Sequence, residues 1–127
     1  MNALLVALGG AAGAAARYGV GVALARWSPA AALPWGTWGA NLAGCFLIGL
    51  ALPLLDTPNN PERAGLQLLL VTGVLGGFTT FSSYTVETLG LALEGRPGLA
   101  LVNAAAPVVL GLAAAALGAW IARVVQA

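Results

Sequence analysis

Histidine is absent from this chain, cysteine occurs once, and charged residues are scarce. Only 7% of the 127 residues are Asp, Glu, Lys or Arg, whereas soluble domains carry about 25%. A single cysteine cannot form an intramolecular disulfide, and without histidine or a second cysteine there is no Cys/His metal cluster. The net charge of +1 provides no basic patch for nucleic acid. These absences exclude a disulfide scaffold, a Cys/His metal centre and a nucleic-acid-binding role.

The chain also lacks the side chains from which catalytic centres are usually built. Without histidine, no serine or cysteine has the common general base, and the acidic residues form no obvious pair. The serines lie among threonines rather than in a triad-like arrangement. We therefore predict that the protein is not an enzyme.

Long apolar runs are abundant, since 60% of the residues are hydrophobic. Four runs, at about 3–25, 35–55, 64–93 and 99–121, each reach the roughly 20 residues that a membrane-spanning helix needs. The first has no basic segment before it, which argues against a cleaved signal peptide. The sequence predicts an all-α integral membrane protein with four transmembrane helices per subunit, forming one transmembrane domain over residues 1–127.

Arginines are divided almost evenly between the two predicted sides of the membrane. Four spans put both termini on one side, together with Arg63 and Arg123, and leave Arg26 and Arg96 on the other. Because the Lys/Arg bias sets the direction of insertion, a balanced chain can insert both ways. We hypothesise dual topology and an antiparallel dimer with a two-fold axis in the membrane plane.

Pairs of small residues four apart predict close helix packing. Gly9 with Gly13 and Gly73 with Gly77 form GxxxG motifs, and Ala40 with Gly44 forms a related pair. Packing within the chain and packing between subunits explain these motifs equally well. A dimer is favoured because polar groups in a membrane must face a bundle interior or a water-filled cavity.

The third apolar run contains a polar stretch, GVLGGFTTFSSYTVE, at 73–87. Gly76 and Gly77 weaken the helix and predict a break in mid-membrane, which frees carbonyl oxygens that can coordinate a cation. The alternative is a kinked helix whose freed groups are capped by the side chains of Thr79 or Thr80. The clustering of these residues indicates a functional site.

Three further polar side chains lie within the predicted spans, and each has two interpretations. Asn41 is either a donor to an anion or a partner in an interhelical hydrogen bond. Arg17 either attracts anions to a vestibule or extends to the membrane surface. Glu87 is either a carboxylate at a pore mouth or an ordinary partner for arginine.

Phe81 and Tyr84 lie three residues apart, so a helix presents both rings on one face. Such pairs are commonly core packing. However, the ring edge is electropositive and can stabilise a dehydrated anion in a narrow path. Hydroxyl donors stand alongside at Thr79, Thr80, Ser82 and Ser83.

Three stretches are specific marks of a known family: GGAAGAAARYG at 9–19, GTWGANLAG at 36–44 and GVLGGFTTFSSYTVET at 73–88. In these stretches, and over essentially its full length, the chain resembles the Fluc family of fluoride channels. It implies an antiparallel homodimer in the lipid of a bacterial or archaeal plasma (inner) membrane. It also implies passive export of fluoride through two pores, and a structural sodium ion at the dimer centre.

The resemblance also implies roles for individual residues. The family's sodium is held by main-chain carbonyls that map onto Gly76 and Thr79. Its pore-lining amide maps onto Asn41, and its pore aromatics map onto Phe81 and Tyr84.

Two positions depart from the family pattern. The second pore aromatic is usually phenylalanine, whereas Tyr84 adds a hydroxyl that either donates to fluoride or points elsewhere. The fourth helix of some members carries polar residues at steps of four, where this chain has Asn103, Pro107 and Gly111. We expect the polar track to depend instead on three hydroxyls, those of Thr80, Ser82 and Ser83.

Two alternative functions remain. A small proton-coupled multidrug exporter would need a carboxylate within the membrane, and Glu87 is the sole acidic residue inside the predicted spans. A non-conducting subunit that requires a paired partner is the other alternative.

Overall fold

The structure is a computed structural model that describes residues 2–27, 32–55 and 61–126. Four of its helical stretches are long and apolar enough to cross a membrane: Asn2–Trp27, Trp35–Leu55, Arg63–Leu93 and Pro97–Gln126. The prediction of an all-α protein with four such helices is therefore confirmed. Parts of two predicted connections, residues 28–31 and 56–60, lie outside the described residues.

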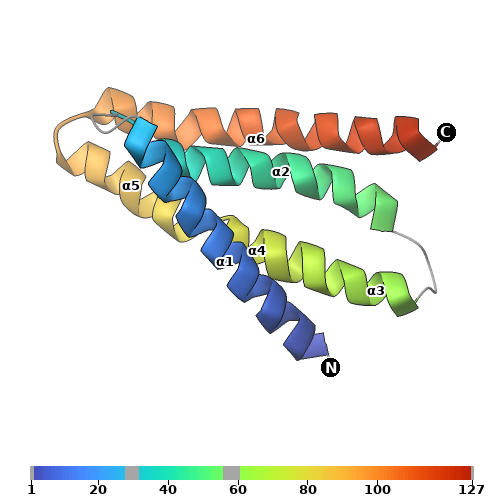
Figure 1. Ribbon diagram of the computed structural model, residues 1–127. Coiled ribbons are helices and arrows are strands. Elements are labelled where there is room, and N and C mark those ends of the chain that lie inside the picture. The colour runs from blue at the N-terminus through green and yellow to red at the C-terminus, as the bar shows by residue number, and fades with distance from the viewer. Residues whose placement is uncertain (1, 28–31, 56–60, 127) are drawn as a thin grey trace.

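The helices form a bundle that places both ends of the chain on the same side (Figure 1). Helix α2 (Trp35–Leu55) packs along most of α6 (Pro97–Gln126). Helix α1 (Asn2–Trp27) crosses obliquely and packs against the third span. Helices α1 and α6 run in opposite directions. Arg26, at the end of α1, and Arg96, just before α6, therefore lie at one end of the bundle. Arg63 and Arg123 lie at the other end.

The third span consists of several segments. It begins with α3 (Pro61–Gln67), continues as the π-helix η1 (Leu68–Leu75) and then as the short α4 (Gly76–Phe78). Thr79 and Thr80 have extended backbone, with φ/ψ of −87°/156° and −148°/124°. Helix α5 (Phe81–Leu93) follows, and Gly95 turns the chain toward α6 with a φ of 74°.

Glycines allow α1 to lie directly against the third span. A Cβ atom on Gly9 or Gly13 would collide with backbone atoms of η1, and one on Gly77 would collide with the backbone of Gly10. Such close approach favours dense van der Waals packing between membrane helices. The two GxxxG motifs therefore pack within the chain, one of the two alternatives that the sequence left open.

Candidate functional site: an interrupted helix between two cavities

Asn41 of α2 binds the backbone where the third span is interrupted. The N–H of Thr80 donates to Asn41 Oδ1 over 2.9 Å, and Asn41 Nδ2 donates to the carbonyl of Thr80 over 3.1 Å. In a continuous α-helix the Thr80 N–H would donate to the carbonyl of Gly76, four residues earlier. Asn41 thus replaces a helical partner and leaves the Gly76 carbonyl without its usual donor.

Arg17 of α1 supports the same interruption from the other side. Its Nε donates to the carbonyl of Gly77 over 3.2 Å, the carbonyl that Phe81 N–H would reach in a continuous helix. The side chain of Arg17 therefore points into the bundle and does not extend to the end of α1. Among the described residues, the other N–H groups of the guanidinium have no partner, and Arg17 lines the adjacent cavity.

Thr80 is the N-cap of α5. Its Oγ1 accepts from the backbone N–H of Ser83 over 3.2 Å, which is the usual capping bond of a threonine. In a continuous α-helix the Ser83 N–H would donate to the carbonyl of Thr79. Capping by the Thr80 side chain, one of the predicted alternatives, thus occurs together with the bonds from Asn41 and Arg17. The carbonyls of Gly76 and Thr79 have both lost their helical donors.

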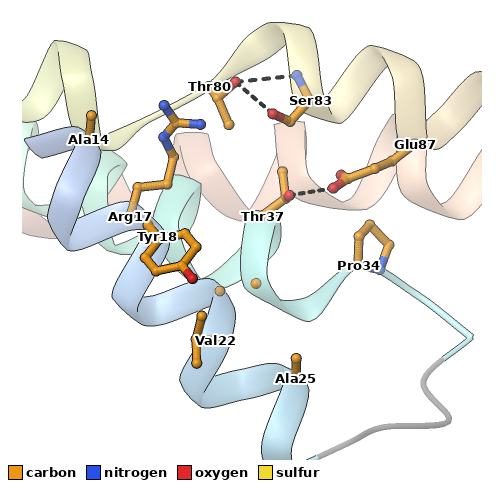
Figure 2. A pocket seen from close by; sticks show the side chains of 12 residues that line it. Ala14, Arg17, Tyr18, Val22, Ala25, Pro34, Thr37, Thr80, Ser83 and Glu87 are labelled. Carbon is orange, nitrogen blue, oxygen red and sulfur yellow. Dashed lines mark hydrogen bonds between the residues drawn. The ribbon is translucent and has the colours of Figure 1, made fainter.

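A cavity of about 620 Å³ lies between α1, α2 and α5. Figure 2 shows Arg17 extending into it toward Thr80, with Ser83 and Glu87 along the α5 side. Thr37 Oγ1 donates to Glu87 Oε1 over 2.7 Å, while Oε2 is buried without a partner among the described residues. Glu87 therefore bonds a threonine of α2, and the described residues include no arginine ion pair with it.

A second cavity, of about 480 Å³, lies between α2, η1, α5 and α6. Asn41 and Gly76 line it, and so do the rings of Phe81 and Tyr84. Thr80 lines both cavities and therefore lies at their junction. The polar groups predicted for a pathway thus meet where the helix is interrupted.

The two aromatic rings lie together, but the Tyr84 hydroxyl points elsewhere. The ring centroids of Phe81 and Tyr84 are 5.6 Å apart at an interplanar angle of 36°. The hydroxyl of Tyr84 donates to the carbonyl of Ala104 in α6. The Tyr84 hydroxyl is thus hydrogen-bonded to α6, while Tyr84 also lines the second cavity. Phe81 is 76% exposed in the isolated subunit.

Not every predicted residue joins this arrangement. Ser82 is exposed and lines neither cavity, although its Oγ lies 3.3 Å from Thr80 Oγ1. Asn103 is completely buried and bonds to Trp38 and Thr88.

Sequence reasoning assigned no role to Thr37, Trp38 or Thr88. All three lie inside the motifs GTWGANLAG and GVLGGFTTFSSYTVET, and that position indicates a role near the site.

Comparisons with known proteins extend over most of the chain. A family model described as CrcB-like protein, Camphor Resistance (CrcB), matches residues 4–119. The chain is 51% identical over 116 residues to the fluoride-specific ion channel FluC of Thermus thermophilus, covering 91% of this chain and 90% of that protein. Proteins of the same name from Salinibacter ruber and Solibacter usitatus are each 45% identical, covering 94% and 97% of this chain and 87% and 99% of their own lengths.

Proposed function

Because this chain belongs to the CrcB-like family, whose relatives bear the name fluoride-specific ion channel, we propose that it conducts fluoride passively across a bacterial inner membrane. Fluoride channels are not enzymes, so this chain is not an enzyme. The observation that carries the proposal is the position of Thr80, which lines both cavities and is bonded by Asn41.

The proposed path replaces the water around fluoride with fixed donors. Fluoride is small and strongly hydrated, so a selective path must offer donors and yet bind weakly enough to release the ion. The Thr80 hydroxyl donates to Ser83 Oγ over 3.2 Å, so the donors that remain for an anion in the first cavity are the Ser83 hydroxyl and the guanidinium of Arg17. Beyond Thr80, Asn41 has a second amide N–H with no partner among the described residues.

The rings of Phe81 and Tyr84 continue this path along the second cavity. Their electropositive edges stabilise an anion without a strong bond. Ser82 has no place in this path, because it lines neither cavity. The hydroxyl track therefore consists of Thr80 and Ser83 rather than all three predicted hydroxyls.

An antiparallel homodimer with two pores is part of the proposal. The second cavity borders Phe81, which is 76% exposed in the isolated subunit, so a second copy is needed to enclose the path. The interruption at Thr79 and Thr80 falls near the middle of the span Arg63–Leu93, which supports a break in mid-membrane. Arginines at both ends of the bundle support insertion in both directions.

A structural sodium ion fits the backbone at this interruption. The Thr80 N–H bonds Asn41 and the Ser83 N–H bonds Thr80 Oγ1, so the carbonyls of Gly76 and Thr79 are left with acceptor capacity. Carbonyl oxygens are suitable ligands for an alkali cation. We propose that the ion is held by four carbonyls, two from each subunit. Because both subunits would bind the same cation, the ion would hold the two copies together.

Removal of sodium is expected to weaken the dimer and slow fluoride efflux. A ligand that binds only the assembled protein stabilises it by mass action, so the thermal midpoint should rise with sodium concentration. Size-exclusion chromatography and thermal unfolding in sodium or in N-methylglucamine measure this effect without relying on transport. Identical assembly, midpoint and efflux in the two salts would reject the ion site at Gly76 and Thr79.

The test of the proposed function is release of fluoride from liposomes that contain the purified protein, followed with a fluoride electrode. Release faster than from protein-free liposomes supports a channel. Release no faster than that supports a non-conducting subunit that requires a partner. Release that needs a proton gradient supports the proton-coupled class of transporter.

A further inference from the structure

Asn103 is a polar side chain with 0% solvent exposure inside the apolar helix α6. A buried amide is costly in a membrane protein unless it is hydrogen-bonded. Its partners come from two other helices: Trp38 Nε1 of α2 donates to Oδ1 over 2.7 Å, and Nδ2 donates to Thr88 Oγ1 of α5 over 2.8 Å. The side chain thereby joins α2, α5 and α6.

The chemistry of the partners fixes the direction of these bonds. An indole N–H only donates, so the carbonyl end of the amide must face Trp38 and the NH₂ end must face Thr88. Thr88 Oγ1 therefore accepts from Asn103, and its own hydrogen goes to the carbonyl of Tyr84, 2.7 Å away. The bonds form one ordered chain from Trp38 through Asn103 and Thr88 to Tyr84.

Tyr84 is held at a second point by the same turn of α6. Its hydroxyl donates to the carbonyl of Ala104, the residue that follows Asn103. The ring between these two anchors lines the second cavity, beside Phe81. A shift of α5 relative to α6 would therefore move a ring that lies in the proposed fluoride path.

We propose that Asn103 is a positioning residue for anion passage, because it acts through Thr88 to fix α5 and so to hold the Tyr84 ring in one orientation. This inference rests on the proposed function. It differs from a purely structural role in one respect: loss of the bond changes the discrimination between fluoride and chloride in protein that still assembles.

The test compares Thr88→Val, Thr88→Ser and Asn103→Leu with the wild-type protein in liposomes loaded with fluoride or chloride. Valine has nearly the shape of threonine but neither accepts from Asn103 nor donates to Tyr84. If the energy of one interhelical hydrogen bond in a membrane is lost entirely from the barrier for fluoride, the rate ratio changes by roughly 3- to 10-fold. We expect the fluoride-to-chloride efflux ratio to fall by that factor in Thr88→Val, and by at least that factor in Asn103→Leu, which also loses the bond from Trp38.

Two further variants make the result specific. Thr88→Ser keeps the hydroxyl and should retain the wild-type ratio, and the double variant Thr88→Val/Asn103→Leu should be no worse than the more affected single variant. Thr85→Val is the matched control, since among the described residues the exposed Thr85 hydroxyl bonds the carbonyl of Ser82 alone. It should leave the ratio unchanged.

A wild-type ratio in assembled Thr88→Val protein would overturn the proposal, even if Asn103→Leu failed to assemble. An equal loss in Thr88→Ser and Thr88→Val would also overturn it, because the hydroxyl would then be irrelevant. Wild-type protein that releases no fluoride would instead contradict the proposed function itself.

Discussion

Replacing Phe81 with isoleucine is expected to slow fluoride efflux by roughly 10- to 100-fold while the protein still assembles. The ring lines the second cavity beside Tyr84 and is 76% exposed in the isolated subunit. Isoleucine is apolar and bulky but lacks the electropositive ring edge. Because the ring is little buried within its own subunit, the substitution should cost the fold of that subunit little.

Efflux from liposomes, measured beside size-exclusion chromatography, separates a pathway defect from an assembly defect. Phe46→Ile is the matched control, because Phe46 is an aromatic residue of α2 that lines neither cavity. It should conduct at the wild-type rate. Wild-type efflux from the Phe81 variant would reject a role for this ring in the anion path. Loss of the assembled form alone would assign the ring to subunit contact.

Asn41→Leu is expected to abolish efflux and also to destabilise the protein. Leucine leaves the part-buried N–H and carbonyl of Thr80 without their partners, and an unsatisfied group costs at most about 1–3 kcal/mol, the value for full burial. The expected loss of stability is therefore at most about 2–6 kcal/mol. Thermal unfolding in detergent and fluoride efflux measure the two effects separately.

Asn41→Asp distinguishes the two interpretations of this residue. Aspartate keeps an acceptor for the Thr80 N–H but lacks the amide donors, and its charge repels an anion. We expect this variant to conduct poorly and also to lose stability, because a carboxylate oxygen in place of Nδ2 faces the Thr80 carbonyl and cannot donate to it. If Asn41→Asp conducted like the wild type, the amide would serve only to bond the Thr80 backbone and would not donate to fluoride.

The four spans could be predicted from the sequence because length and apolarity alone define them. The interruption also had a local signal, since Gly76, Gly77 and the adjacent threonines weaken a helix. The exclusion of Ser82 had no such signal, because Ser82 and Tyr84 are each about 100° from Ser83 around the helix, and Tyr84 lines the second cavity whereas Ser82 lines neither.

The partners of the interruption could not be predicted, because they depend on how distant helices meet. The sequence left Asn41 with two interpretations, and only the packing of α2 beside Thr80 pairs it with both backbone groups. Likewise, no periodicity joins Trp38 to Asn103, which lie 65 residues apart. The π-helical geometry of Leu68–Leu75 has no signal in an apolar run of this kind.

The most direct test of a passive fluoride channel is electrode-detected efflux from liposomes loaded with potassium fluoride, with valinomycin added to carry the compensating potassium. A passive channel is expected to release fluoride when valinomycin is added, without any proton gradient, and to release little chloride under the same conditions. Release equal to that of protein-free liposomes, or release only when a proton gradient is imposed, would contradict the account.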